Sequence, residues 1–193
     1  MTGSGGSKAL APFLLAEVAT IIGEIAGRQQ TMVALVGGFA MQYFGSPRLT
    51  GDVDVIAVSP LHDLEPTAAL NFGGQKTTVV APGNTSVGTN VLVPVDVIVR
   101  DDEFANLYTA ALDHVLDMGA PLPVVEPEYI AAMKLVARRP KDEEDLAFLV
   151  TAHVIDLGKA ERVIRKHLGG AFAAREFRAS VEEAIWRASR AER

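Results

Sequence analysis

Met32-Val-Ala-Leu-Val-Gly-Gly-Phe-Ala-Met-Gln-Tyr-Phe-Gly45 is an apolar run that ends in a glycine pair and passes into a short segment with helical character. Arg48-Leu-Thr-Gly-Asp-Val-Asp-Val-Ile56 follows almost at once. Side chains alternate between the faces of a strand, so Asp52 and Asp54 share one face and the valines beside them occupy the other. Such a pair adds little to stability, but its oxygen atoms suit a divalent cation. We therefore expect a strand–turn–helix unit followed by an acidic strand.

The length and composition are typical of a single-domain globular protein. The chain has 193 residues, of which 49% are hydrophobic and 6% aromatic, which suits a globular α+β or α/β protein. Its formal net charge of −6 argues against a broad nucleic-acid-binding face. Because it has no Cys, disulfides and thiolate zinc sites are excluded, and we expect a cytoplasmic location.

The N-terminal segment contains no pattern for crossing a membrane. Residues 1–8 are rich in Gly and Ser, and we expect a disordered end there. Residues 10–25 carry a helical apolar stripe, but Glu17 and Glu24 interrupt the run. It is too short and too charged to span a bilayer, so we expect an amphipathic helix and no membrane partner.

The remaining patterns predict a mixed sheet followed by helices. We expect an α/β core over residues 9–125 and a helical region over residues 126–193. The strands are expected at residues 31–36, 52–58, 76–81 and 90–99, with a small hairpin at 115–118 and 122–125. The helices are expected at residues 39–44, 104–112, 127–139, 141–156, 159–168 and 172–188. Pro82-Gly83-Asn84 is the expected hairpin turn, residues 61–70 fit either a helix or a loop, and Pro140 should break the first C-terminal helix.

A third acid repeats the pattern of the first two. Pro94-Val-Asp-Val-Ile98 places Asp96 on a strand with β-branched residues on the opposite face. If this strand pairs with the first acidic strand, Asp96 lies across from Asp52 or Asp54, about 5 Å away between Cβ atoms. Carboxylates this close repel by about 3 kcal/mol per pair at an effective dielectric constant near 20. Protonation or a hard cation such as Mg²⁺ or Mn²⁺ would relieve the repulsion.

The glycine pair adds a second element to this chemistry. Gly37 and Gly38 stand at a strand-to-helix turn, where the absence of side chains lets a phosphate approach backbone N–H groups. Two cations held by nearby carboxylates can activate an attacking hydroxyl and stabilise a leaving phosphate oxygen. Together these features suggest metal-assisted nucleotidyl transfer.

Gly37-Gly38, Arg48-x-Thr50-x-Asp52-x-Asp54 and Val95-Asp96-Val97 occur in the order found in one large group of enzymes. They resemble the motifs of the nucleotidyltransferase superfamily, whose simplest members have the polymerase-β-like fold. The stretch from Tyr129 to Leu149 is similar to the branch of AbiEii-like abortive-infection and toxin nucleotidyltransferases and related bacterial proteins. The resemblance covers residues 31–150, so it is far more specific than a lone Asp-x-Asp.

The resemblance implies a role for each matching residue and a cleft completed by the helical region. Asp52, Asp54 and Asp96 would bind Mg²⁺ or Mn²⁺, and Asp96 would also activate the acceptor hydroxyl. Lys134 would contact the triphosphate of an NTP, and Asp142 or Asp145 would orient Lys134 or bind nucleotide. The nucleotide site would also include the following residues: Gly37, Gly38, Arg48, Thr50 and Arg138. The acceptor would be tRNA, a protein or a small molecule, and a cognate toxin or antitoxin would be a partner.

Phe39 departs from the superfamily pattern, because many members have Ser after the glycine, where its hydroxyl touches phosphate. Phosphate contact would then rest on backbone amides, Arg48 and Lys134.

The polar residues assigned to the nucleotide site also have a purely structural explanation. Arg48 and Thr50 fit a loop packed on the acidic strand, Lys134 fits a snorkelling lysine, and residues 141–145 fit a charged helix start.

Three hypotheses follow from these patterns. The first is a Mg²⁺-dependent nucleotidyltransferase that uses an NTP. The second is a nucleotidyltransferase-like module that has lost turnover and acts through a protein partner, for which Phe39 is the main support. The third is a structural protein whose acids are ordinary surface residues, and it predicts no saturable metal site.

Overall fold

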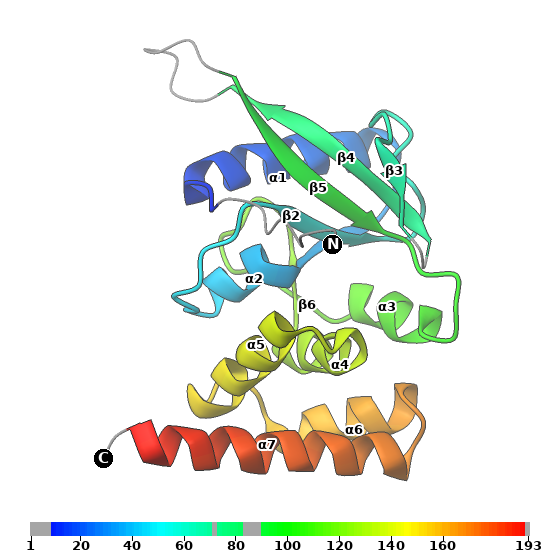
Figure 1. Ribbon diagram of the computed structural model, residues 1–193. Coiled ribbons are helices and arrows are strands. Elements are labelled where there is room, and N and C mark those ends of the chain that lie inside the picture. The colour runs from blue at the N-terminus through cyan, green and yellow to red at the C-terminus, as the bar shows by residue number, and fades with distance from the viewer. Residues whose placement is uncertain (1–8, 71–72, 83–89, 192–193) are drawn as a thin grey trace, which may run out of the picture.

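The computed structural model describes residues 9–70, 73–82 and 90–191, and it shows a sheet half above a helical half (Figure 1). The expected disordered end at residues 1–8 lies outside the described residues, as does most of the expected Pro82-Gly83-Asn84 turn. No helix in the described ranges combines the length and apolar character that crossing a membrane requires.

The secondary structure follows the predicted order. The strands are β1 (Val33–Val36), β2 (Val53–Ala57), β3 (Ala68–Ala69), β4 (Gly74–Ala81), β5 (Val91–Ile98), β6 (Val115–Leu116) and β7 (Val124–Val125). The helices are α1 (Pro12–Arg28), α2 (Gly37–Tyr43), α3 (Ala105–Leu112), α4 (Pro127–Ala137), α5 (Pro140–Thr151), α6 (Leu157–His167) and α7 (Ala171–Ala191). The undecided segment 61–70 contains turns and the short strand β3.

The strands form one mixed seven-stranded sheet in the order β3-β4-β5-β2-β1-β7-β6. At its centre β2 is antiparallel to β1 and parallel to β5, and β4 is antiparallel to β5. The predicted hairpin of residues 115–125 is present as β6 and β7. The expected mixed α/β fold is therefore confirmed.

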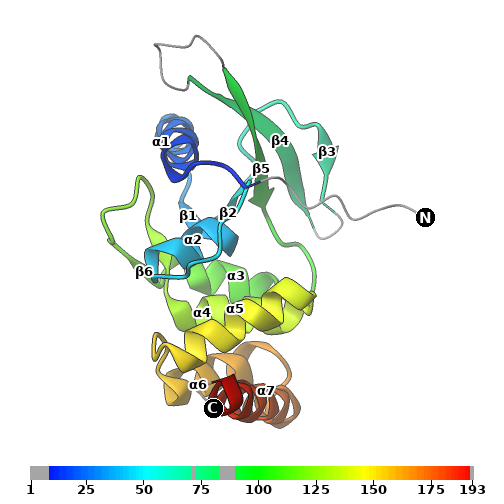
Figure 2. The same cartoon turned by 60° about the vertical axis from the view of Figure 1, so that its left-hand side comes forward.

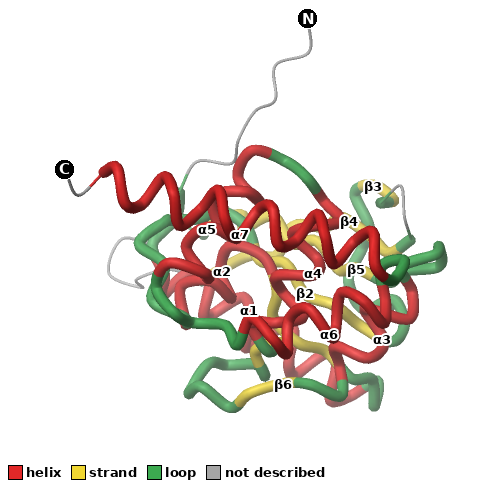
Figure 3. The backbone as a smooth tube through the Cα atoms, turned by 90° about the horizontal axis from the view of Figure 1, so that it is seen from below, coloured by secondary structure: helices red, strands yellow, loops and turns green. Residues whose placement is uncertain are grey.

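The helices are distributed unequally around the sheet. Helix α1 packs against β4, β5 and β2, whereas α2 lies beside β2 and β1 (Figures 1 and 2). Helices α4 and α5 lie between the sheet half and the outermost pair, α6 and α7, which face the viewer in Figure 3. Helix α3 contacts both β2 and α4, so it closes the space where the two halves meet.

The break between α4 and α5 has a local cause. Arg138 adopts a left-handed conformation with φ of 52°, and its N–H donates to the Lys134 carbonyl oxygen. Pro140 then occupies the first turn of α5, where its missing N–H is not needed. Helix α5 ends at Thr151, earlier than the expected residue 156, because His153 also takes a left-handed conformation and Asp156 caps α6 by accepting from the Lys159 N–H.

Candidate active site

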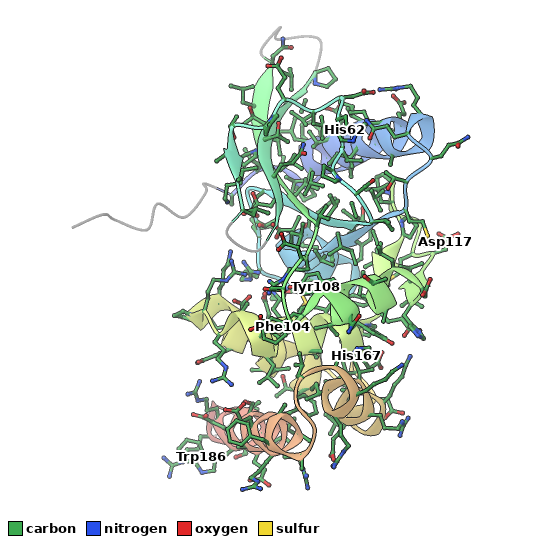
Figure 4. The ribbon with its side chains drawn as sticks, turned by 90° about the vertical axis from the view of Figure 1, so that its right-hand side faces the viewer. His62, Phe104, Tyr108, Asp117, His167 and Trp186 are labelled. Carbon is green, nitrogen blue, oxygen red and sulfur yellow. The ribbon has the colours of Figure 1, made fainter. Side chains whose placement is uncertain are left out.

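A pocket of about 380 Å³ lies between the edge of β2 and β5 and the helices α3, α4 and α5. Its charged lining residues are Asp54, Asp96, Arg100, Lys134, Arg139 and Asp142. Its apolar and aromatic lining residues are Val36, Ile98, Phe104, Tyr108, Ile130, Met133, Val136 and Ala137. Figure 4 shows Phe104 and Tyr108 at the level where the sheet half meets the helical half. The pocket therefore joins an ionic region to an apolar one.

The glycine pair makes room for side chains of the acidic strand. Gly37 has φ of +66°, and a Cβ there would come within 1.9 Å of Asp54 Oδ2. A Cβ on Gly38 would come within 2.8 Å of Thr50 Oγ1. Both contacts are closer than real Cβ atoms come, so a side chain at either position would have to displace Asp54 or Thr50. The Asp54 carboxylate thus lies directly against the β1–α2 turn.

Asp54 and Asp96 lie side by side on parallel strands. They are register partners in the β2–β5 ladder, as expected if these strands pair. Asp96 accepts hydrogen bonds from Lys76 Nζ at 3.1 Å and 3.0 Å, one to each carboxylate oxygen. Asp52, just before β2, accepts from the Thr50 hydroxyl. No described residue donates a hydrogen bond to the Asp54 side chain, so among the three acids it has the least compensation.

The lack of a hydrogen-bond donor to Asp54 is accompanied by a raised pKa of its carboxyl group. The pKa of Asp54 is raised to about 7, chiefly by burial and further by the negative charges of Asp52 and Asp96. The positive charges of Lys141 and Lys134 partly offset it. A carboxylate that holds its proton so tightly is short of positive charge, which a bound cation would supply.

Opposite the acids, Lys134 is the centre of a buried ionic network. Its Nζ donates to Asp142 Oδ1 at 3.1 Å and to Asp145 Oδ2 at 2.5 Å. Asp145 also accepts from Nε and Nη2 of Arg48, both at 2.8 Å, and Asp142 accepts from Arg139 Nε at 2.6 Å. Three cations thus share two carboxylates, and the network keeps one excess positive charge facing the acidic strands.

Hydrogen bonds within this network shift pKa values away from neutrality, as Arg48 and Asp142 show. The hydrogen bonds with Asp145 raise the pKa of Arg48 despite partial burial. Burial alone would raise the pKa of Asp142, but hydrogen bonds from Arg139 and the charge of Lys134 outweigh it and lower the pKa. Both groups therefore stay ionised near neutral pH.

The structure brings together most, but not all, of the residues expected to contact nucleotide. Gly37, Lys134 and Asp142 line the pocket, and Arg48 and Asp145 join it through the ionic network. Arg138 is directed elsewhere: its side chain is 62% exposed and donates to Glu176 Oε2 at 2.6 Å. The position of Phe39 is also informative, because its ring is buried against Tyr43 and does not line the pocket.

Several lining residues were not anticipated from the sequence. Arg139 takes the position toward the pocket that was expected for Arg138. Arg100 lies over the rings of Phe104 and Tyr108, at 5.3 Å and 5.0 Å from their centroids. Two signals were present: Arg100 follows Asp96 by four residues along a strand direction, and Phe104 and Tyr108 have the four-residue spacing of one helix face.

The carboxylates of Asp52, Asp54 and Asp96 are compatible with a divalent cation, although the three are not arranged around one shared position. Within residues 9–70, 73–82 and 90–191, no group of three or more His, Cys, Asp or Glu side chains is arranged to hold a metal ion. Thr50 and Lys76 engage two of the three expected ligands. The uncompensated Asp54, beside Asp96 in the ladder, nevertheless has the hard oxygen chemistry that Mg²⁺ or Mn²⁺ prefers.

Comparison with known proteins identifies the fold. The sequence matches no protein-family model and no curated protein. The structure is similar to the crystal structure of an antigenic nucleotidyltransferase-like protein from Paracoccidioides brasiliensis, with a TM-score of 0.51 and 16% sequence identity. The match covers 91% of this chain and 95% of the other. The seven-stranded mixed sheet and the helical half therefore have a nucleotidyltransferase-like fold.

Proposed function

We propose that the protein is a metal-dependent nucleotidyltransferase that moves a nucleotidyl group from an NTP to an acceptor hydroxyl. The observation that carries the proposal is the position of Asp54. It lies against Gly37, beside Asp96, and in the same pocket as Lys134 and Arg139. Paired acids on the sheet side and a network with more cations than acids on the helical side suit a reaction in which a metal–triphosphate complex must be held and polarised.

The two regions of the pocket suit the two ends of an NTP. The excess positive charge of the network around Lys134 and Arg139 would attract the triphosphate. The apolar region would receive the nucleobase, with Phe104 as a stacking surface and Met133 on α4 beside it. The α-phosphorus would then lie near the β2–β5 carboxylates.

In the reaction, the acceptor oxygen forms a bond to the α-phosphorus, and the bond to the leaving pyrophosphate breaks. The proton of the acceptor hydroxyl passes to Asp96, the outer of the two paired carboxylates. Asp54, Asp52 and Asp96 would hold Mg²⁺. When bound, this ion would neutralise negative charge and lower the pKa of the acceptor hydroxyl. Lys134, fixed by Asp142 and Asp145, would hold the departing phosphates without reorientation.

The acceptor and the biological setting are part of the same proposal. By resemblance to the AbiEii-like branch, the acceptor would be tRNA or a protein, or else a small molecule. A cognate toxin or antitoxin would bind the protein within a toxin–antitoxin or phage-defence system. The resemblance of the stretch from Tyr129 to Leu149 is the basis for this part of the proposal.

The direct test uses each NTP labelled in the α-phosphate, Mg²⁺ and total cell extract, followed by separation of RNA, protein and small molecules. The proposal expects the wild-type protein to add α-label to one acceptor above the level seen with extract alone, and Asp54→Asn to add none. The same NTP labelled in the γ-phosphate should give no such increase in any acceptor, because that label leaves with pyrophosphate. An Asp54→Asn variant as active as the wild type would overturn the proposal.

A binding module without turnover is the second candidate function. Two observations favour it: the ammonium group of Lys134 is already paired with Asp142 and Asp145, and Phe39 supplies no phosphate-binding hydroxyl. This candidate expects an NTP with Mg²⁺ to raise the melting temperature of the wild type while no fraction acquires label. Labelled product would exclude it.

A further inference from the structure

We infer that the ammonium group of Lys76 is an internal counter-ion that holds Asp96 in the metal-free protein and competes with a divalent cation for it. The inference rests on the proposed function, because it concerns how the proposed metal site is completed. It assigns Lys76 as a positioning residue that sets when Asp96 becomes available.

The sheet fixes this pair by its register. Strands β4 and β5 are antiparallel, and Lys76 is the direct partner of Asp96 in their ladder. Directly opposite residues project from the same face, so the lysine side chain extends over its partner. Its Nζ lies 3.1 Å and 3.0 Å from the two carboxylate oxygens. Both oxygens of the third expected ligand are thus occupied by one protein cation.

The surroundings show why a counter-ion is present there. Asp96 is the register partner of Asp54, which has no described hydrogen-bond donor. Without Lys76, two unneutralised carboxylates would face each other across neighbouring strands and repel. Lys76 supplies one positive charge, whereas a divalent cation would supply two and could bridge both acids. The lysine therefore acts as a weaker substitute that the metal must displace.

The exposure of the pair allows this displacement. The side chain of Lys76 is 50% exposed and that of Asp96, which lines the pocket, is 26% exposed, so the ion pair is in contact with solvent. A long, flexible lysine there can swing into water when a cation binds. The arrangement also fits the absence of an assembled three-carboxylate cluster among the described residues, where Thr50 engages Asp52 as Lys76 engages Asp96. Completion of the site would then depend on the cation that arrives.

The test measures Mn²⁺ binding to nucleotide-free protein by the electron paramagnetic resonance signal of free Mn²⁺. Lys76→Met should bind Mn²⁺ about tenfold more tightly than the wild type, because the competitor is removed. Lys76→Arg, which keeps the charge, should bind like the wild type. Thr78→Met, two residues along the same strand, should also be unchanged and controls for added apolar surface. Unchanged or weaker binding by Lys76→Met would overturn the inference.

Two further comparisons keep this result separate from the proposed function. In an Asp96→Asn background, Lys76→Met should leave the Mn²⁺ affinity unchanged, because the lysine acts through Asp96. Urea unfolding of Lys76→Met should show lower stability than the wild type in EDTA and higher stability in saturating Mn²⁺. If Asp54→Asn abolishes Mn²⁺ binding but Lys76→Met changes nothing, the inference fails alone. If Asp54→Asn binds Mn²⁺ like the wild type, the proposed metal site fails and the inference with it.

Discussion

Arg48 and Asp145 form a two-pronged ion pair that joins the segment before β2 to helix α5 across 97 positions of the chain. Both hydrogen bonds measure 2.8 Å, and the Asp145 side chain is 2% exposed. Asp145 also accepts from Lys134, so one carboxylate connects the sheet half to two helices of the helical half. The wall of the pocket is therefore held by a buried ionic link between distant segments.

Removing this carboxylate should be strongly destabilising. Asp145→Ala leaves Lys134 buried with one partner fewer and Arg48 without its ion pair, and we expect a loss of about 3 kcal/mol in the free energy of unfolding. Glu143→Ala, an exposed position on the same helix, should change it by less than about 0.5 kcal/mol. Urea unfolding measures both variants, and equal effects would refute the structural role of Asp145.

The contact between Gly37 and Asp54 predicts a sharp difference between two glycines. Gly37→Ala should lose at least about 1 kcal/mol from the left-handed backbone alone and should also displace the Asp54 carboxylate. Gly27→Ala on α1, where an added Cβ meets nothing within 4 Å, should gain about 0.5–1 kcal/mol. Thermal unfolding in EDTA compares them. A neutral Gly37→Ala variant would contradict the close approach.

The raised pKa of Asp54 predicts a pH-dependent stability in EDTA. Because the folded-state pKa of about 7 exceeds the unfolded value, the native state binds more protons between pH 4 and 7, and stability falls as pH rises through that window. Asp54→Asn lacks this loss. The free energy of unfolding of Asp54→Asn, relative to that of the wild type, should therefore rise from pH 4 to 7 by at most about 1.4 kcal/mol per pH unit. Above pH 7 the difference should stay constant. Urea unfolding of both proteins at a series of pH values measures this difference. A difference that does not change with pH would contradict the raised pKa of Asp54.

The aromatic wall predicts a selective loss of nucleobase binding. Phe104→Ala should weaken binding of an NTP with Mg²⁺ about tenfold, since stacking on an aromatic side chain contributes about 1–3 kcal/mol per base. Binding of inorganic tripolyphosphate should be unchanged in the same variant. Phe172→Ala, at an exposed position on α7, is the matched control. Isothermal titration calorimetry measures each affinity, and equal losses for both ligands would remove Phe104 from the base site.

Local patterns were sufficient to predict the acidic strands. Alternation along residues 52–58 and 90–99 placed Asp54 and Asp96 on strands, and the structure pairs them as neighbours. The helical half was also readable, because Pro140 marks the break between α4 and α5. These features depend on residues close together in the sequence, where the period of the apolar side chains carries the information.

Contacts between distant segments could not be read in this way. The partner of Arg48 lies on α5, and Lys76 meets Asp96 only through the β4–β5 register. The choice between Arg138 and Arg139 depended on one left-handed residue at the end of α4, which directs Arg138 to Glu176. The direction of a side chain after the end of a helix depends on the backbone conformation there, which the sequence pattern does not predict.

An NTP should bind together with a divalent cation between Asp54 and the network around Lys134. Calorimetric titration of the wild type and Asp54→Asn with a non-hydrolysable NTP analogue, with and without Mg²⁺, measures this binding. We expect saturable, Mg²⁺-dependent binding to the wild type and at least about tenfold weaker binding to the variant. Absence of binding, or equal affinity of the two proteins, would contradict it.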